Sequence, residues 1–538
     1  MGNITINKLV LFISVLFTAL YNYSFFKAVI GVYGIDGFYF IYILSIILVL
    51  ISLNVFIFSL ISGKYTIKPL SILIIFLSSF CAYFMDSYNT VIDSEMIRNI
   101  LQTNLDESMD LFNIKLVLYI LFLGLVPSYI VYKIKIDYKP FKQALILKLK
   151  ALFLSLLVIV IMIFSFSKFY TSFFREHKPL RFQVNPIYWI YSIGNYIHES
   201  LTSGPIVVKQ VGEDAKIIPG VNNESNEEPE LVIMVVGEAA RADRFSLNGY
   251  EKETNPLLKK ENIINFPNMY SCGTTTAQSV PCMFSIYDRP DYDYKKGIST
   301  ENVVDVLNHT KFVNILWRDN NSDSKGVALR VDFQDYRSSE NNTMCDEVEC
   351  RDEGMLVGLE DYINKHKNED ILIVLHQMGN HGPAYYKRYP KKFEKFTPVC
   401  KTNQLEECTK EEVNNAYDNA ILYTDYFLSK VINFLKPYSK SHETAMIYMS
   451  DHGESLGDNG IYLHGLPYMF APEEQKHIGS LMWFGQTIKE DIDVDKLNSY
   501  SNKKFTQDNL FHTLLGIFEV ETKVYDKNKD ILNDARKH

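Results

Sequence analysis

The stretch LVIMVVGE, residues 231–238, shows the pattern that decides the fold of the second half of the chain: a short apolar run that ends in a carboxylate. From about residue 230 onward, similar apolar runs alternate with helical stretches. This alternation predicts an α/β domain with a mostly parallel sheet. Because ligands of such sheets gather at the carboxyl ends of the strands, the residues that follow each run are the candidates for chemistry.

Polar side chains that suit a metal or phosphate site follow four of these runs. They are Glu238 after LVIMVVG, Asn320, Asn321 and Lys325 after VNILW, His376 and His381 after ILIVL, and Asp451, His452 and Glu454 after TAMIYM, with His464 farther on. Each residue alone has a simpler interpretation as a solvated carboxylate, a helix cap or a structural histidine. Their convergence on one sheet edge favours a shared metal site.

A carboxylate, an imidazole and an oxygen donor form a good ligand set for Zn²⁺. We expect Glu238, Asp451 and His452 to hold one ion and to leave a fourth position for a nucleophile. The three other histidines of the set could bind phosphate, transfer protons or hold a second ion.

The nucleophile candidate lies in SCGTTTAQSVPCMFS, residues 271–285, where three threonines stand between two cysteines. Pro281 is compatible with the first turn of a helix, which would place the threonines at a helix N-terminus that favours phosphate. Coordination to zinc would lower the pKa of a threonine hydroxyl. The simpler interpretation is a threonine helix cap in a stapled loop, and only the residues at the strand ends argue against it.

Six of the seven cysteines fall in the polar part of the chain as close pairs: Cys272 with Cys282, Cys345 with Cys350, and Cys400 with Cys408. Three local disulfides in an oxidising compartment explain this spacing. The sequence does not fix the pairing, and nearest-neighbour pairing is the simplest. Zinc thiolates are the alternative, which the lack of a C-x2-C spacing disfavours.

Five charge-free apolar runs precede residue 170, at 9–26, 37–63, 69–85, 116–132 and 151–167. Each is about long enough to span a bilayer, for which a helix needs roughly 17–25 residues. Buried core helices, or a signal peptide for the first run, are the alternatives, and five runs in succession disfavour both. Lysine-rich loops after the second and fourth runs put the N-terminus in the cytoplasm and everything beyond about residue 170 outside.

The expected organisation is therefore a five-helix transmembrane domain at 1–170, a bridging helix and linker at 171–229, and a catalytic domain at 230–538. The net charge of −9 makes nucleic acid an unsuitable partner.

The blocks GEAARADRFSLNGYEKETNP, SCGTTTAQSVPCMFS, LHQMGNHGPAYYKRY, YDNAILYTD and SDHGESLGDNGIYLHG together resemble the phosphoethanolamine transferases that modify lipid A, a group that includes the mobile colistin-resistance enzymes. The resemblance covers essentially the whole chain. It implies an α/β/α catalytic domain of the alkaline phosphatase and sulfatase type behind five membrane helices, in the bacterial inner membrane, with that domain in the periplasm.

The resemblance also implies roles for individual residues. The nucleophile would be Thr276, and the ligands of one tightly bound Zn²⁺ would be Glu238, Thr276, Asp451 and His452. Substrate phosphate would be bound by Asn321, Lys325, His381 and His464, while His376 and Glu454 would lie near a second metal or act as acid and base. The segment MIRNILQTNLDES matches the membrane-proximal substrate region, where Asn99, Thr103 and Glu107 at i, i+4 and i+8 would share one helix face. Ala239 departs from the family, in which threonine is frequent.

The implied reaction moves phosphoethanolamine from phosphatidylethanolamine to lipid A at the bilayer surface, by a monomeric enzyme, and it confers resistance to polymyxins and other cationic peptides. A phosphoglycerol transferase shares this layout, but the three cysteine pairs favour phosphoethanolamine. A core sugar or a surface protein is the alternative acceptor. A non-catalytic receptor built on a dead hydrolase domain would lack a ligand or the nucleophile, and the sequence lacks neither.

Overall fold

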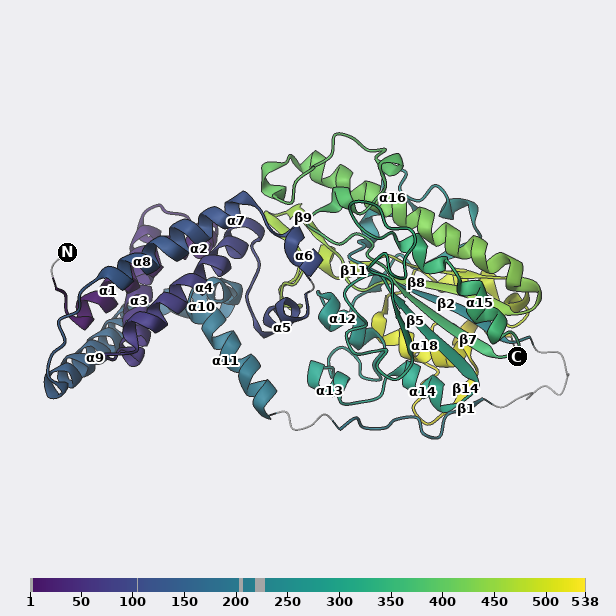
Figure 1. Cartoon of the computed structure of the whole chain (residues 1–538), viewed down its shortest axis with the longest axis horizontal. Helices are drawn as coiled ribbons and strands as arrows, with labels where there is room; N and C mark the ends of the chain where they lie inside the picture. Colours follow the sequence, from purple (N-terminus) through teal and green to yellow (C-terminus); the bar gives the residue numbers. More distant parts are fainter. Residues whose placement is uncertain (1–2, 104, 203–206, 218–227, 538) are drawn as a thin grey trace. The chain divides into compact units, whose positions relative to one another are not determined.

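The computed structural model describes residues 3–103, 105–202, 207–217 and 228–537. The chain forms two compact units (Figure 1). The first contains Met1–Ile97 and Phe112–Leu201, and the second contains Arg98–Leu111 and Thr202–His538. The short segment Arg98–Leu111 therefore belongs to the second unit, although in sequence it lies between two apolar helices of the first.

Within the described residues, four helices of the first unit are long and apolar enough to cross a membrane. They are α3 (Phe38–Ile61), α4 (Ile67–Tyr88), α9 (Phe141–Ser165) and the continuous helix Ile114–Lys133. The last comprises α7 (Ile114–Tyr119), η1 (Ile120–Leu125) and α8 (Val126–Lys133). Many of their large apolar side chains are exposed, for example Phe153 and Phe164 of α9. Exposed apolar helices of this length are expected of a protein whose solvent is lipid.

The first apolar run, at 9–26, does not form one straight helix. Helix α1 (Ile6–Leu20) and helix α2 (Tyr23–Tyr33) meet at a bend of 57°, so they make a fifth span only if the bent pair is counted as one. At the bend, the Asn22 amide donates to the carbonyls of Phe17 (2.9 Å) and Asn185 (2.7 Å). A side-chain amide that takes a helix carbonyl competes with the backbone ladder, which explains why the helix breaks there.

Helix α10 (Ser167–Glu176) crosses the expected boundary at residue 170, and helix α11 (Ile187–Thr202) lies within the expected bridging region. Residues 203–206 and 218–227 of the expected linker lie outside the described part of the chain.

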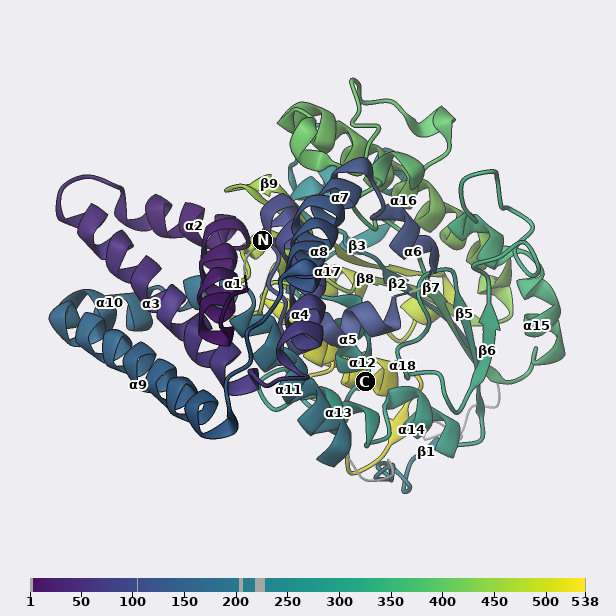
Figure 2. The same ribbon diagram turned by 60° about the vertical axis from the view of Figure 1, so that its left-hand side comes forward.

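A seven-stranded sheet forms the centre of the second unit, in the order β3-β12-β8-β2-β7-β5-β6. Five neighbouring strands run parallel: β8 (Glu443–Ser450), β2 (Glu230–Gly237), β7 (Asp370–His376), β5 (Val313–Asp319) and β6 (Asp332–Asp335). Strand β12 (Ser480–Phe484) pairs antiparallel with both β8 and β3 (Ile263–Asn265). The mostly parallel α/β sheet expected from the sequence is confirmed, and Figure 2 shows β5 and β6 together at one edge.

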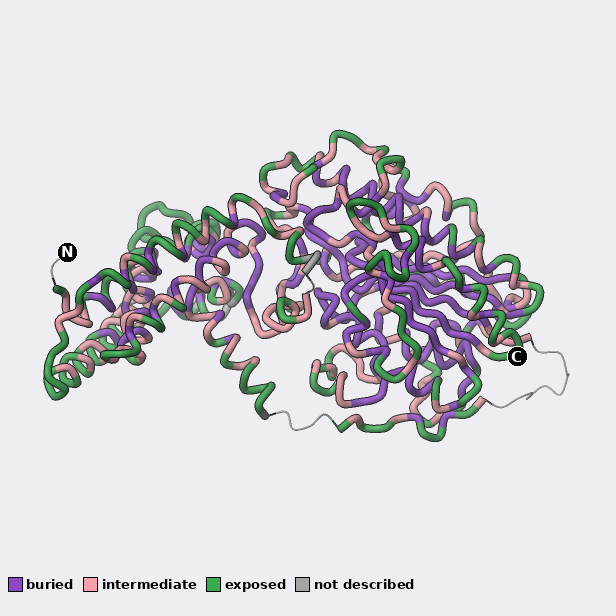
Figure 3. Tube along the Cα trace, viewed as in Figure 1, coloured by how far each residue is buried: buried purple, intermediate pink, exposed green. Residues whose placement is uncertain are grey.

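Helices cover both faces of this sheet. The long helix α16 (Lys410–Leu435) runs along one face, and α12 (Thr276–Met283), α14 (Val303–His309) and α18 (Leu510–Ile517) lie on the other (Figure 1). The central strand β2 is buried from Leu231 to Val236, and Figure 3 shows the middle of the sheet buried. Strands buried on both faces are continuous apolar runs, which is why LVIMVV carries no alternation.

The three disulfides join nearest neighbours: Cys272 to Cys282, Cys345 to Cys350, and Cys400 to Cys408. Each closes a loop of ten residues or fewer in the second unit, so each stabilises local structure rather than the packing of distant elements.

One histidine of the core makes the second unit sensitive to acid. His512 of α18 is 3% exposed, and its Nδ1 accepts the N–H of Asp526 at 3.1 Å. Burial, and next to it the charge of Lys529, lower the pKa of His512 from 6.5 to about 4. Between these values the unfolded chain binds the proton and the folded chain does not, so stability falls as the pH drops from 6.5 toward 4.

We expect the melting temperature of the protein to fall over this range and His512→Gln to remove part of the dependence. The measurement is thermal unfolding of the detergent-solubilised protein across that pH range, with His366→Gln at a partly exposed position as the control. An unchanged pH dependence in His512→Gln would contradict this account.

Candidate metal and nucleophile site

The site begins where two adjacent parallel strands end. Gly237 of β2 pairs with Ser450 of β8, so the residues that follow, Glu238 and Asp451, emerge side by side. The N–H of Asp451 donates to the Gly237 carbonyl at 2.9 Å, which extends the ladder by one residue. A Cβ at Gly237 would lie 2.6 Å from the Tyr448 ring, so glycine is required for this close approach.

Four side chains meet at this point. The ligand atoms of Glu238, Asp451 and His452 lie within 4.8 Å of one another, and all three side chains are fully buried. The hydroxyl of Thr276 donates to Glu238 Oε2 at 3.1 Å and lies 3.4 Å from His452 Nε2. The structure thus brings together the four residues that the sequence analysis predicted as metal ligands and nucleophile.

This donor set fits a metal ion. Two fully buried carboxylates beside an imidazole nitrogen and a hydroxyl are costly without a compensating cation. The ring of His452 is turned so that its Nδ1 faces the Gly453 carbonyl at 2.8 Å, which leaves Nε2 toward the carboxylates. Burial lowers the pKa of His452, so the ring is neutral and its Nε2 can act as a ligand. Two carboxylates, one imidazole and one hydroxyl match the preferences of Zn²⁺.

Thr276 is the first residue of α12, a short helix held by hydrogen bonds to the loop before it. Pro281 therefore lies in the second turn of this helix rather than in the first, because the helix begins at the last of the three threonines. The Cys272–Cys282 disulfide joins the loop to the helix, and the N–H of Gly273 donates to Ser279 Oγ at 2.8 Å. The disulfide and this hydrogen bond thus hold the loop before Thr276 against the helix that Thr276 begins.

A second group of ligand-type atoms adjoins the first. His452, Glu454 and His464 offer atoms within 4.8 Å of one another, and the rings of His452 and His464 are 4.2 Å apart. Glu454 Oε2 lies 2.7 Å from His464 Nδ1, and Glu454 Oε1 accepts the hydroxyl of Tyr385 at 2.6 Å. Glu454 therefore orients the ring of His464 beside the metal ligand His452.

The other residues nominated for phosphate binding lie around this edge of the sheet. The amide of Asn321 donates to Glu238 Oε2 at 2.9 Å and to the Gln377 carbonyl at 2.7 Å, so it orients a ligand carboxylate. Lys325 Nζ donates to the Ser322 carbonyl at 2.7 Å. The ring of His381 is 6.1 Å from that of His464, and burial, followed by the charge of Arg388, holds the pKa of His381 well below 6.5.

His376 does not join either group of ligand-type atoms among the described residues. It is the last residue of β7, its Nδ1 lies 2.8 Å from Asp319 Oδ2, and its ring meets that of Trp317 edge-on at 5.9 Å. The indole N–H of Trp317 donates to the same Asp319 oxygen at 2.9 Å. His376 therefore forms a buried pair with Asp319 at the carboxyl end of β5.

The membrane-proximal candidates do not share one helix face. Helix α5 (Ser94–Gln102) ends before Thr103, whose hydroxyl donates to the Asn99 carbonyl at 2.8 Å, and α6 (Leu105–Asp110) begins anew. The i, i+4, i+8 spacing alone does not ensure a continuous helix, because a threonine hydroxyl that donates to the carbonyl one turn back competes with the backbone hydrogen bonds of the helix. The side chain of Glu107 lies outside the described residues.

Sequence reasoning missed several residues that hold the site together. Gln507 accepts the N–H of Cys272 at 2.6 Å and donates to the carbonyls of Ser450 and Asp451 at 2.8 Å, so it links the nucleophile loop to the metal-ligand loop. Tyr385 holds Glu454. The quoted block LHQMGNHGPAYYKRY contains Tyr385, but no local signal distinguishes Gln507, because its contacts join segments that are distant in sequence.

The fold and the site define the chain's class. Residues 230–520 match the family model described as Sulfatase, and residues 50–201 match the model described as Phosphoethanolamine transferase EptA/EptB. The second unit is therefore an alkaline phosphatase/sulfatase-like domain, joined to a helical region that carries four or five apolar spans.

Relatives of known activity share nearly the whole chain. Phosphatidylethanolamine transferase Mcr-1 of Escherichia coli is 44% identical over 534 residues, which cover 97% of this chain and 96% of the relative. Phosphoethanolamine transferase EptA of Escherichia coli K12 is 40% identical over 530 residues, with 96% and 94% covered.

A solved full-length structure agrees. The integral membrane lipooligosaccharide phosphoethanolamine transferase A of Neisseria meningitidis matches with a TM-score of 0.94 at 33% identity over 100% of both chains. The chain belongs to the phosphoethanolamine transferase family and is a membrane protein with a soluble catalytic domain.

Proposed function

We propose that this protein moves phosphoethanolamine from phosphatidylethanolamine to a phosphate group of lipid A through a phosphothreonine at Thr276. The observation that carries the proposal is the hydroxyl of Thr276, 3.1 Å from Glu238 Oε2 and inside the buried set that includes Asp451 and His452. Its relatives over nearly the whole chain are phosphatidylethanolamine and phosphoethanolamine transferases by name, which supports the donor and the transferred group.

In the first half-reaction, Thr276 Oγ1 attacks the phosphorus of the donor lipid, and the bond from phosphorus to the diacylglycerol oxygen breaks. Glu238 Oε2 accepts a hydrogen bond from the Thr276 hydroxyl and can take its proton as the new bond forms. Zn²⁺ bound by Glu238, Asp451, His452 and Thr276 would lower the pKa of the hydroxyl and offset charge on the phosphoryl oxygens. The leaving diacylglycerol oxygen takes a proton from a histidine, for which His464, oriented by Glu454, is placed.

In the second half-reaction, a phosphate oxygen of lipid A attacks the same phosphorus, and the bond to Thr276 Oγ1 breaks. The threonine regains its proton from Glu238, the proton of the attacking lipid A phosphate returns to His464, and the product carries one phosphoethanolamine. Lys325, His381 and His464 bind and orient the phosphoryl oxygens at this edge of the sheet. Asn321, nominated with them, instead uses both amide hydrogens to hold Glu238 Oε2 and the Gln377 carbonyl. His376 pairs with Asp319 and lies outside both groups of ligand-type atoms among the described residues, so we do not assign a second zinc ion to it.

The product also explains a physiological role. Phosphoethanolamine adds an amine cation to an anionic head group, which weakens the attraction of cationic peptides such as polymyxins and colistin. Because both substrates are lipids, we place the protein in the inner membrane as a monomer, with the N-terminus in the cytoplasm and the catalytic domain in the periplasm. Asn99, Thr103 and Glu107 belong to the segment that would meet the lipid substrates.

The test is the mass of lipid A from cells that produce the protein, beside cells that produce Thr276→Ala at equal membrane abundance. We expect a gain of one phosphoethanolamine unit with the parent protein alone. Unmodified lipid A in both, with phosphoethanolamine on a core sugar or a surface protein, would overturn the assignment of the acceptor but not that of the donor.

A further inference from the structure

A nearly buried guanidinium lies beside the proposed phosphate-binding loop. Arg388 follows the short helix η7 (Tyr385–Lys387), and its side chain is 4% exposed. Its Nε donates to the carbonyl of His381 at 2.7 Å. Its two terminal nitrogens pair with different carboxylates, Nη1 with Glu349 and Nη2 with Asp110. The three bonds of one planar group therefore point to three separate segments of the chain.

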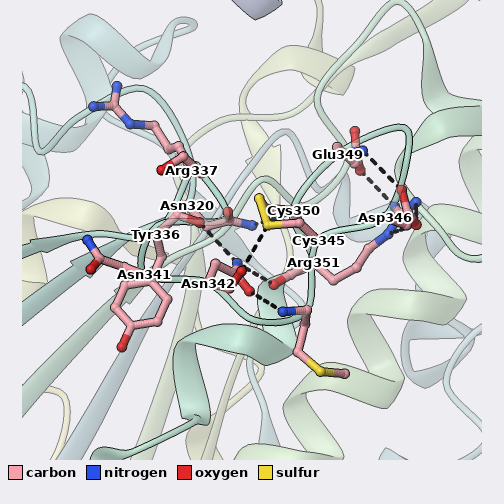
Figure 4. The surroundings of a disulfide bond; sticks show 12 residues. Asn320, Tyr336, Arg337, Asn341, Asn342, Cys345, Asp346, Glu349, Cys350 and Arg351 are labelled. Carbon is pink, nitrogen blue, oxygen red and sulfur yellow. Dashed lines mark hydrogen bonds and ion pairs between the residues drawn. A yellow bond between two sulfur atoms is a disulfide. The ribbon is translucent and has the colours of Figure 1, made fainter.

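The first carboxylate belongs to the loop closed by the Cys345–Cys350 disulfide (Figure 4). Arg351, which follows the disulfide, donates to Glu349 Oε1 at 2.9 Å and to Asp346 Oδ2 at 2.8 Å, so it holds the loop from within. Arg351 also donates to the Lys387 carbonyl at 2.7 Å, one residue before Arg388. The disulfide loop and the Arg388 segment are thus joined by two independent contacts.

The second carboxylate lies at the end of α6, in the segment Arg98–Leu111 that forms part of the same compact unit. Asp110 pairs with Lys387 as well as with Arg388, and its carbonyl accepts the amide of Asn403. Burial raises the pKa of the Asp110 carboxyl, but the two cations outweigh burial and bring it below its ordinary value. The carboxylate is therefore ionised, and the pair is charged at neutral pH.

We propose that Arg388 is a positioning residue, which fixes the backbone of His381 and ties it to the Cys345–Cys350 loop and to the segment Arg98–Leu111. The proposal rests on the proposed function, in which His381 binds a phosphoryl oxygen. Arginine is required because its rigid fork donates in three directions at once, whereas a lysine ammonium is a single point of charge on a flexible stem. A turn that carries a phosphate ligand needs such support, since a small misplacement lowers the rate strongly.

The first test is a double-mutant cycle on the rate of transfer, with Arg388→Lys, His381→Ala and the combination. If Arg388 acts through His381, Arg388→Lys lowers the rate about tenfold or more in the parent and has no further effect once His381 is alanine. Equal losses in both backgrounds would overturn the proposal. Arg330→Lys, which disturbs a similar forked pair with Asp305 of α14, is the matched control and should act independently of His381.

Two further variants can replace Arg388→Lys in this test if that variant folds poorly. Asp110→Asn and Glu349→Gln each remove one carboxylate partner and leave Arg388 in place. Each should lower the rate of transfer in the parent by less than the roughly tenfold expected of Arg388→Lys. Neither should lower the rate further in the His381→Ala background. Losses that persist there would contradict the proposal.

The second test does not depend on activity. The rate at which diethyl pyrocarbonate modifies His381, followed by peptide mass spectrometry, should rise in Arg388→Lys and stay at the parent rate in Arg330→Lys. An unchanged rate at His381 would overturn the positioning role. A parent protein that transfers nothing would refute the proposed function, while the modification rate would still decide whether Arg388 positions His381.

Discussion

Thr276→Ala is expected to lower the transfer of phosphoethanolamine by roughly 10³-fold or more, as loss of a covalent nucleophile does in other enzymes. The Thr276 hydroxyl lies at the buried ligand set, where it can form and release a phosphoester, and it donates a hydrogen bond to Glu238 Oε2 at 3.1 Å. The fold should survive, because alanine suits the first position of a helix and the change removes few contacts.

The measurement is the rate of diacylglycerol release from phosphatidylethanolamine in mixed micelles, with thermal unfolding as the check on folding. Thr276→Ser is the matched control, since it keeps a hydroxyl at the same position and should retain part of the activity. Thr275→Ala, which removes the neighbouring hydroxyl, should retain far more. Comparable release by Thr276→Ala and the parent would exclude Thr276 as the nucleophile.

Asp451→Asn should abolish both metal binding and transfer without disrupting the loop. Asp451 Oδ1 accepts the N–H of Ala239 at 3.0 Å and that of His452 at 2.7 Å, and the amide oxygen of asparagine can accept both. Oδ2, the oxygen that lies 3.3 Å from His452 Nε2, is replaced by an uncharged amide. Ala239 has a positive φ of 51°, a strained conformation for a residue with a side chain, so its bond to Asp451 is needed to hold this turn.

The measurement is metal content together with the melting temperature in the presence of chelator and of added zinc. Zinc should raise the melting temperature of the parent, because a ligand that binds only the folded state stabilises it, and should have little effect on Asp451→Asn. With chelator, the variant should be at least as stable as the parent, since one of two neighbouring buried charges is gone. Asp425→Asn, at a buried carboxylate bonded to the N–H groups of Leu257 and Leu258, is the control that should still bind zinc. Full zinc content in Asp451→Asn would contradict the ligand assignment.

The sequence predicts those parts of the site that depend on one strand and the residue after it. Glu238 and Asp451 emerge side by side because β2 and β8 are adjacent and parallel, and the apolar runs before them already indicate such strands. The three disulfides join nearest neighbours, the simplest of the pairings that the sequence left open.

Contacts between distant segments could not be predicted in this way. Gln507 is more than two hundred residues away in sequence from Cys272, whose N–H it accepts. Asp110 and Arg388, which form an ion pair, are separated by a comparable length of chain. His376 is the last residue of β7, at the sheet edge where the sequence predicted a site residue, yet its ring pairs with Asp319, because the direction of a side chain depends on its neighbours in the sheet. The bend at Asn22 and the end of α5 before Thr103 each arise from the hydrogen bonds of one side chain, which periodicity does not register.

The most direct measurement is the mass of the protein itself after it is mixed with phosphatidylethanolamine in the absence of any acceptor lipid. The account predicts a gain of one phosphoethanolamine unit, located by peptide mass spectrometry at Thr276 and lost again when lipid A is added. Release of diacylglycerol with no mass gain under rapid quenching, or a gain at another residue, would contradict it.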